Sequence, residues 1–335
     1  LYALLIGAFT VGMRRLPVFE PDMMEADLAF SLIVVFRNEE ANLNRLIQNL
    51  NELNYPKDKF EVLLINDASE DGSLDLVKSL QKELPGLNLR IFELSAPSSS
   101  PKKNALELGV RNASYEWIVT TDADCFLSKD YLMAYDQFLS VNSSEMIAGP
   151  VISTGQDSFL HRFQSLDFLS LQGATMGGFG GSGFIPFLRP FMCNGANLCY
   201  KKETFSKLGG YSGNKELATG DDVFMLEKML QKHADKVHFI KSRAALVRTK
   251  PKETWKGLVS QRVRWASKTS SYENRFAKFV GLLVFFANAS LIFGLVLALL
   301  GFLNWPYLGV LFVLKLNADF LLIYSTASLL SLIHI

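Results

Sequence analysis

A long uncharged segment near the end of the chain limits what this sequence can fold into. Residues 279–303 read FVGLLVFFANASLIFGLVLALLGFL and contain no Asp, Glu, Lys or Arg. About 20 consecutive apolar residues are enough for a helix to cross the hydrocarbon core of a bilayer. The segment therefore predicts a transmembrane helix over 279–303.

A second apolar stretch follows at 308–335, after a turn whose Trp305 and Tyr307 suit a membrane interface. It contains Lys315 and Asp319, which are four positions apart and can pair inside a helix bundle. We predict a second, truncated transmembrane helix here. A buried core helix of a soluble domain is the alternative.

The start of the chain is also apolar. Residues 1–15 are too short to span a bilayer and end in Arg14 and Arg15, so we expect them to be the remnant of an N-terminal transmembrane helix. Because the sequence begins without Met and stops in an apolar run, we expect a fragment of a longer protein.

Positive charge indicates which side of the membrane the remaining residues occupy. Between Lys241 and Val280 eleven Lys or Arg stand against two Glu, just before the first complete predicted span. Lys and Arg that flank spans mark the cytoplasmic side. We therefore place a domain over 26–270 on the cytoplasmic face of the cytoplasmic membrane, with 251–278 as a basic interfacial helix region.

Whole-chain composition excludes other classes. The 34 basic and 33 acidic residues of this 335-residue chain leave a net charge of +1, so we expect no nucleic-acid partner. Cys125, Cys193 and Cys199 form no CxxC pair and have no nearby His, which argues against a zinc site or a disulfide framework.

Apolar runs and helical patterns alternate through the first half of the soluble region. This alternation predicts a mostly parallel sheet with helices on both faces, whose ligands bind beyond the carboxyl ends of the strands. Residues beyond about 145 are less regular, and Gly177 to Gly183 are expected to form a flexible loop. The predicted strands are Phe30–Phe36, Phe60–Asn66, Leu89–Phe92 and Trp117–Thr121, and the helix after the first strand is expected to begin with Asn38 as its N-cap.

Acidic residues gather at these strand ends. Asp122 and Asp124 follow a buried strand, and alternate side chains of an extended segment share a face, so both could reach one hard cation. A DxD is expected about 0.8 times by chance in this composition, so its position carries the argument. Asp67 closes the second strand and could accept hydrogen bonds from a base or ribose, or cap the following turn. Lys102 opens a helix and could pair with a diphosphate, or be simply solvated.

A second acidic pair precedes another helix. Asp221 and Asp222 could stabilise a helix start through its dipole. The functional interpretation requires a carboxylate base beside an acceptor hydroxyl, and Asp222 suits that role best, with Asp221 as its support or alternative.

The most specific motif is Gln261-Arg262-Val263-Arg264-Trp265. A QxxRW pattern is expected only about 0.004 times by chance. On a helix, Gln261, Arg264 and Trp265 share one face and offer an amide, a guanidinium and an indole. A basic amphipathic helix lying on anionic headgroups is an interpretation that can hold at the same time.

The ordered motifs resemble those of membrane-integrated family 2 glycosyltransferases, which include cellulose, hyaluronan and poly-N-acetylglucosamine synthases and ceramide glucosyltransferases. The resemblance covers about residues 30–305 and rests on SLIVVFRNEE, IND, KKNAL, TDAD, GDD and QRVRW in that order. It implies a GT-A fold with C-terminal transmembrane helices, a nucleotide-sugar donor such as a UDP-sugar, Mg²⁺ or Mn²⁺ as cofactor, and inversion at the anomeric carbon.

The resemblance also implies a role for each site residue. Asp67 would contact the nucleotide base, Lys102 and Arg264 the donor phosphates, and Asp122 the ribose, diphosphate or metal. Asp124 would ligate the metal, Asp222 would act as base, and Gln261 and Trp265 would line the acceptor site.

The chain departs from the family pattern at two places. Gly220-Asp221-Asp222 stands where many members carry Thr-Glu-Asp, and Cys193-Asn194-Gly195 stands where many synthases carry Cys-Gly-Ser. The acceptor therefore stays open between a membrane lipid and a growing polysaccharide, and so does processivity. A nucleotidyltransferase, which also uses carboxylates and a metal, is the alternative from another class.

Overall fold

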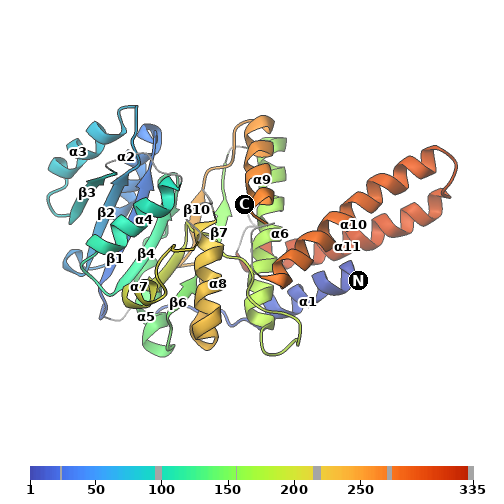
Figure 1. Ribbon diagram of the computed structural model, residues 1–335, viewed down its shortest axis with the longest axis horizontal. Helices are drawn as coiled ribbons and strands as arrows, with labels where there is room; N and C mark the ends of the chain where they lie inside the picture. The colour runs from blue at the N-terminus through green and yellow to red at the C-terminus, as the bar shows by residue number, and fades with distance from the viewer. Residues whose placement is uncertain (23–24, 95–99, 156, 214–219, 270–273, 331–335) are drawn as a thin grey trace. The chain divides into compact units, whose positions relative to one another are not determined.

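The computed structural model describes residues 1–22, 25–94, 100–155, 157–213, 220–269 and 274–330 (Figure 1). The chain divides into two compact units. Val18–Gln156 and Cys193–Lys252 form the first, called the α/β unit below. Leu1–Pro17, Asp157–Met192 and Glu253–Ile335 form the second, called the helical unit.

Strands and helices alternate through the first part of the α/β unit, as the sequence predicts. The central strands β1 and β2 are mostly apolar and almost entirely buried, which is typical of a sheet covered on both faces. The elements are β1 (Phe30–Phe36), α2 (Glu40–Asn51), β2 (Phe60–Asn66), α3 (Ser73–Glu83), β3 (Leu89–Glu93), α4 (Pro101–Asn112) and β4 (Trp117–Asp122).

The later part of this unit has shorter elements. They are β5 (Phe126–Leu127), α5 (Tyr131–Val141), β6 (Met146–Ala148), β7 (Val151–Ser153), β8 (Leu198–Lys201), α7 (Lys202–Lys207), α8 (Asp221–His233), β9 (Val237–Phe239) and β10 (Val247–Thr249). Within the described residues, seven strands form a sheet in the order β3-β2-β1-β4-β8-β6-β9, and three form a smaller sheet in the order β5-β10-β7. In the larger sheet β8 alone runs antiparallel to its neighbours β4 and β6, so the predicted mostly parallel α/β sheet is confirmed.

The strand order reverses direction between β1 and β4. The chain moves outward from β1 to β2 to β3 and then returns past β1 to form β4. Because parallel crossovers are right-handed, α2 and α3 cover one face of the sheet and α4 covers the other (Figure 1). The loops after β1 and β4 therefore diverge at their carboxyl ends, and such a switch point is where α/β sheets bind ligands.

A buried carboxylate stabilises the opposite edge of the sheet. The fully buried Glu61 accepts hydrogen bonds from the Ser31 hydroxyl at 2.7 Å and from the Ser114 backbone N–H at 2.5 Å. It also pairs with Arg90 at 2.8 Å. Burial alone would raise the pKa of Glu61, but these donors hold the pKa below its usual value. The ionised form therefore stabilises the fold.

We expect Glu61→Gln to lower the free energy of unfolding by about 2 kcal/mol at pH 7, because it leaves a partly buried Arg90 without its anion. Since the pKa of Glu61 is lowered in the folded state, its contribution is complete above the unfolded pKa and is lost as pH falls through the folded one. Thermal unfolding in detergent measures this. The difference between the variant and the wild type should shrink below about pH 4.

Glu93→Gln is the matched control, since the Lys78–Glu93 pair is about half exposed and its loss should be nearly neutral. Equal melting temperatures for Glu61→Gln and the wild type at pH 7 would contradict the assignment.

The helical unit consists of α1 (Tyr2–Arg15), α6 (Phe159–Gly181), α9 (Trp255–Thr269), α10 (Arg275–Leu299) and α11 (Trp305–Leu329). Among the described residues, α10 and α11 are long and apolar enough to cross a membrane, by length and composition. They match the two predicted C-terminal spans, and residues 331–335 of the second lie outside the described residues.

The predicted flexible glycine loop is wrong. Gly177, Gly178, Gly180 and Gly181 lie inside α6, and only Gly183 follows its end. The glycines are there because α1 packs directly on them. A Cβ at Gly177 would lie 2.4 Å from the carbonyl oxygen of Phe9, and one at Gly12 would lie 2.3 Å from the carbonyl oxygen of Gly177. Small residues of this kind allow close helix approach in membrane-type packing.

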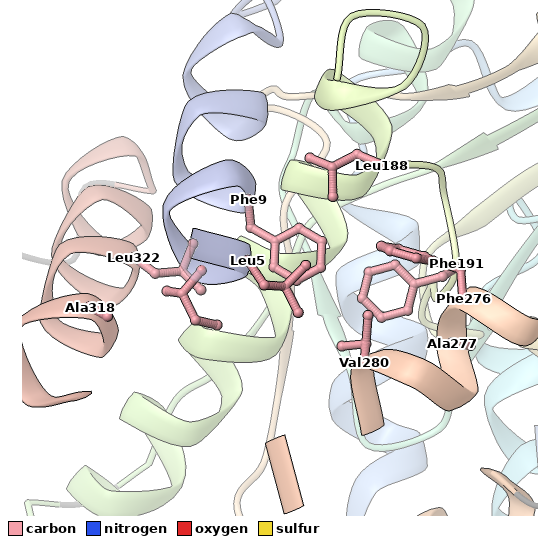
Figure 2. Packing of buried hydrophobic residues seen from close by; sticks show 10 residues of the cluster. Leu5, Phe9, Leu188, Phe191, Phe276, Ala277, Val280, Ala318 and Leu322 are labelled. Carbon is pink, nitrogen blue, oxygen red and sulfur yellow. The ribbon is translucent and has the colours of Figure 1, made fainter. Parts of the chain in front are cut away.

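The apolar core of the helical unit joins α1 to the two C-terminal helices (Figure 2). Phe9 stacks on Phe191 with ring centroids 5.5 Å apart, and Phe276 contacts both rings edge-on. Ala318 and Leu322 of α11 contribute to the same cluster.

A polar contact accompanies this core. The predicted Lys315–Asp319 pair forms at 2.5 Å, and the Tyr2 hydroxyl donates to the other oxygen of Asp319 at 2.5 Å. The pair is thus inside the helix packing, as expected of ionisable groups on an apolar helix.

Candidate functional site

Lys102 lies at the centre of an acidic cluster in the α/β unit. Asp122 is the last residue of β4, and Lys102 is in the first turn of α4. The Lys102 ammonium lies 2.8 Å from Asp122 and 3.7 Å from Asp221. Burial alone would lower the pKa of Lys102, but Asp122, Asp221 and Asp222 together raise it above its usual value. The structure thus brings three sequence-predicted carboxylates together around the sequence-predicted Lys102.

The first turn of α8 holds the second acidic pair. Asp221 and Asp222 are the first two residues of this helix, where the helix dipole favours negative charge. Gly220 precedes them with φ 87°, a left-handed conformation that disfavours any residue with a side chain. Asp221 is buried, and Asp222 is half-buried. Asp222 is therefore the more accessible carboxylate of the pair.

The loop over 193–197 positions Asp222. The Gly195 N–H donates to the Asp222 carboxylate at 3.2 Å, and the Cys193 thiol donates to the Asp222 carbonyl oxygen at 3.4 Å. Thr120 of β4 holds the same loop by donating to the Gly195 carbonyl oxygen at 2.8 Å. A Cβ at Gly195 would approach the Asp221 carboxylate to 3.1 Å, so a side chain here would crowd the acidic pair.

The side chain of Asn197 anchors the end of this loop to three other segments of the α/β unit. Its side-chain oxygen accepts hydrogen bonds from the Tyr131 and Tyr135 hydroxyls, both at 2.7 Å. Its amide donates to the carbonyl oxygens of Pro150 at 2.8 Å and Ala245 at 2.9 Å. Because Asn197 is fully buried with all four hydrogen bonds made, the loop beside Asp222 is rigidly seated.

Asp122 and Asp124 do not lie on one face of an extended segment, contrary to the sequence-based prediction. The strand ends at Asp122, and a tight turn follows in which the Cys125 N–H donates to the Asp122 carbonyl oxygen at 3.1 Å. The two carboxylates therefore interact across a turn, not along one face of a strand. Burial, and then the charge of Asp122, raise the pKa of Asp124, while Lys252 opposes them.

Asp67 lies at the same edge of the sheet. In the register of the sheet, β1 lies between β2 and β4, with Phe36 beside Asn66 and Val35 beside Asp122. Asp67 directly follows Asn66, so it lies two strand spacings, about 10 Å, from the end of β4. Burial raises the pKa of Asp67, and Arg37 opposes it.

Hydrogen bonds join the loops after β1 and β2 beside Asp67. Asn38 is not the predicted N-cap of α2, because it adopts a left-handed conformation with φ 54° and Glu39 takes the cap position. The Asn38 side-chain oxygen accepts from the Glu70 N–H at 2.8 Å, and the Asn38 N–H donates to Ser69 at 3.1 Å. Ala68, next to Asp67, has φ 50°. Strained residues of this kind persist at preorganised sites.

The QxxRW motif belongs to the helical unit. Gln261, Arg264 and Trp265 all lie on α9, so their predicted helical spacing is confirmed. Arg264 is exposed, and Gln261 and Trp265 are half-buried. The Trp265 ring packs against Phe168 of α6 and beneath the guanidinium of Arg262.

Comparison with known proteins decides the family. The family model described as "Glycosyl transferase family 2" matches residues 31–205, which is more than half of the chain and includes the strands and loops that carry Asp67, Lys102, Asp122 and Asp124. The chain belongs to glycosyl transferase family 2. The resemblance found in the ordered motifs is thereby confirmed.

Individual proteins support the same conclusion. The chain is 25% identical over 258 residues to "Probable glycosyltransferase YdaM" of Bacillus subtilis, covering 76% of this chain but 58% of that protein. The "Mannosyltransferase PcManGT from Pyrobaculum calidifontis in complex with GDP-Man and Mn2+" has a similar fold at a TM-score of 0.58 and 17% identity, covering 98% of this chain and 99% of that one. "S. aureus TarS 1-349 in complex with UDP-GlcNAc" matches at a TM-score of 0.50 and 18% identity, covering 68% and 60%. These likenesses confirm the GT-A-like fold.

The acidic residues of this family 2 member have the chemistry of a divalent-metal site. Among the described residues, no group of three or more His, Cys, Asp or Glu could hold a metal by itself. Mg²⁺ in phosphate-transfer sites is held by one or two carboxylates together with substrate phosphates. Asp122 and Asp124 are hard oxygen donors. Burial and, after it, the charge of Asp122 raise the pKa of Asp124, so a bound cation would relieve their repulsion.

The sequence analysis did not identify Glu39, a carboxylate near Asp122 and Asp124. Burial raises the pKa of Glu39, the hydrogen bond from Asn42 opposes this, and the charges of Asp124 and Asp122 raise the pKa further, so Glu39 is electrostatically coupled to both aspartates. Asn42 donates to it at 2.6 Å. Glu39 follows β1 at the carboxyl edge of the sheet, and the positional argument that selects Asp67 after β2 would have selected it too.

Proposed function

We propose that this protein is an inverting, metal-dependent glycosyltransferase that moves a sugar from a nucleotide-sugar, a UDP-sugar by preference, to a lipid or growing polysaccharide at the cytoplasmic face of a membrane. The observation that carries this proposal is the cluster of Lys102 with Asp122, Asp221 and Asp222 at the switch point of the sheet. In this proposal, Lys102 and Asp122 act on the donor and Asp222 acts on the acceptor, so their cluster supports transfer between the two. Family membership favours glycosyl transfer over the nucleotidyl transfer alternative.

Asp67, Lys102 and Asp122 are the proposed donor site. The register of the sheet, which sets Asp67 two strands away from the end of β4, supports its role at the nucleotide base if the diphosphate binds at the end of β4. Lys102 would exchange its carboxylate partners for the donor phosphates, and Arg264 would add a second cation. That the related folds were solved with GDP-Man and UDP-GlcNAc supports a nucleotide-sugar as the donor.

Asp122 and Asp124 would hold Mg²⁺ or Mn²⁺ together with the donor. When bound, the cation would supply charge stabilisation for the departing diphosphate. The solved relative with Mn²⁺ supports this cofactor class.

Asp222 is the proposed base and Asp221 its support. The Asp222 carboxylate is oriented by the N–H groups of Gly195 at 3.2 Å and Val223 at 2.8 Å. From that position it would take the proton of an acceptor hydroxyl as the oxygen attacks the anomeric carbon from the side opposite the leaving diphosphate. Gln261 and Trp265 would line the acceptor site.

The helical unit supports a multi-pass membrane location. We assign residues 1–15 to the remnant of an N-terminal span, 279–303 and 308–335 to C-terminal spans, and 26–270 to the catalytic domain. The basic region 251–278 would lie at the membrane surface. Its helix α9 and the neighbouring α6 expose apolar side chains suited to the headgroup boundary: Phe159, Phe163, Leu166, Trp255, Val259 and Val263.

The decisive experiment measures nucleotide release by the full chain in detergent from a panel of UDP-sugars and GDP-mannose, with Mg²⁺, Mn²⁺ or EDTA. Products formed with added total lipid extract are sized by mass spectrometry. We expect metal-dependent release with one donor. A lipid carrying one sugar would identify a single-transfer enzyme, and a ladder would identify a polymer synthase.

Asp124→Asn should weaken metal-dependent donor binding about tenfold or more, because the site loses one of its two anionic ligands. Titration of UDP binding at increasing Mn²⁺ measures this. Asp235→Asn, on a turn after α8, is a control that should behave as the wild type. If UDP binding by Asp124→Asn depends on Mn²⁺ as in the wild type, Asp124 is not a metal ligand. If the wild type binds no nucleotide, the proposed function is wrong.

A further inference from the structure

Helix α9 is attached to α6 at two places along its length. Near its start, Trp255 packs against Phe159 and Phe163, with ring centroids 6.2 and 5.6 Å apart. Two turns later, Arg262 forms an ion pair with Asp167 of α6. Because the contacts advance in the same direction along both helices, α6 and α9 run parallel and side by side (Figure 1).

The second attachment includes the tryptophan of the QxxRW motif. The Arg262 guanidinium lies over the Trp265 ring, with its central carbon 4.2 Å from the ring centroid. Phe168, the neighbour of Asp167, contacts the same indole at 6.4 Å between centroids. The indole therefore contacts a side chain of α6 and a guanidinium whose counter-ion also comes from α6.

The helical periodicity of α9 explains why Trp265 depends on this contact. At about 100° per residue, Trp255, Leu258, Arg262 and Trp265 share the face that meets α6, and Leu258 is buried there. Gln261 and Arg264 lie on the adjoining side of the helix. Trp265 thus lies at the border between the face of α9 that meets α6 and the side that carries Gln261 and Arg264.

We infer that Asp167 is a positioning residue for Trp265: its carboxylate fixes the Arg262 guanidinium on the indole face and thereby sets the orientation of the indole toward the acceptor. The acceptor part of this inference rests on the proposed function. The Arg262 Nη1 nitrogen is buried and has no hydrogen-bond partner in the described part of the chain. Loss of the Asp167 charge therefore leaves this cation poorly compensated, and the guanidinium would leave the indole.

The test compares Asp167→Asn with Asp167→Glu in the full chain in detergent. We expect Asp167→Asn to raise the apparent KM for added total lipid extract about tenfold, with the KM for the nucleotide-sugar and its hydrolysis without lipid unchanged. Asp167→Glu keeps the charge and should recover most of the loss. Asp157→Asn is the matched control on the same segment, because its pair with Arg162 is exposed and does not reach α9.

A second measurement is independent of the acceptor. Asp167→Asn should change the Trp emission spectrum and acrylamide quenching in the wild-type chain, and have no effect in a Trp265→Phe background. If Asp167→Asn does not fold, Arg262→Gln replaces it, because it removes the same guanidinium from the indole face, and it should change the Trp265 emission and quenching in the same way. A quenching change that persists without Trp265, or an unchanged lipid KM in a transferring enzyme, would overturn the inference. Absence of any transfer by the wild type would instead refute the proposed function and leave the fluorescence test of Asp167 intact.

Discussion

Asp222→Asn is expected to reduce sugar transfer by about 10³-fold while leaving UDP affinity within about twofold of the wild type. The amide cannot take a proton. Gly195 and Val223 donate to different oxygens of the carboxylate, so the single oxygen of the amide keeps one of these two hydrogen bonds. Thr120 and Asn197 still hold the loop beside it, so the loop should stay in place. Initial transfer rates and calorimetric UDP titration, on the same preparation, separate the two effects.

Asp221→Asn makes a useful comparison. Asp221 is buried 3.7 Å from Lys102, so its loss should disturb the Lys102 cluster and weaken nucleotide binding as well as transfer. If Asp222→Asn loses transfer alone and Asp221→Asn loses both transfer and nucleotide binding, Asp222 is the base and Asp221 its support. Turnover of Asp222→Asn at the wild-type rate would falsify the base assignment.

Gly177→Ala is expected to lower the stability of the helical unit by about 3 kcal/mol or to prevent its folding. The added methyl would lie 2.4 Å from a carbonyl oxygen of α1, and backbone atoms cannot move aside as a flexible side chain can. The two helices would have to separate, which would also loosen the Phe9 cluster (Figure 2). Fluorescence-detected size-exclusion chromatography after heating measures the loss.

Gly7→Ala on α1 is the matched control, because no atom lies within 4 Å of a Cβ built there. It should be neutral or stabilise the helix by up to about 1 kcal/mol, as Ala does in a helix interior. If both variants melt at the wild-type temperature, α1 and α6 do not pack through their glycines.

The sheet was predictable because its strands combine two local signals. β1 and β2 are continuous apolar runs, each followed by an amphipathic helix, and buried parallel strands require that pattern. The antiparallel insertion of β8 between β4 and β6 was not predictable. Its neighbours pair with it from positions far apart in sequence, and nothing within Leu198–Lys201 specifies them.

The glycine-rich segment shows where local reasoning fails. Gly173 to Gly181 have low helix propensity, yet they form the end of α6. The compensating contacts come from α1 and α11, and a Cβ at Gly173 would lie 2.4 Å from the Thr326 hydroxyl. Tertiary packing therefore overrides propensity here, and its partners lie at both ends of the chain.

Most of the candidate site could be predicted because α/β sheets place ligands at one edge. That rule selected Asp67, Asp122 and Asp124, and the structure clusters Lys102 with Asp122, Asp221 and Asp222. The supporting residues could not be found in this way. Asn197 acts through four hydrogen bonds to three distant segments, and Asp167 acts through Arg262, about ninety positions later in the chain.

The hydrogen bond between Tyr2 and Asp319 can form only late in the synthesis of the chain. The two residues are 317 positions apart, so at ordinary translation rates α1 exists for tens of seconds before the helix that completes its packing has been synthesised. During that interval the side of α1 that meets α11 has no partner from that helix, whereas its glycine contacts with α6 can already form. A ribosome that stalls before α11 would thus leave the seven described strands of the larger sheet already synthesised, while Tyr2 of α1 still lacks Asp319 as its partner.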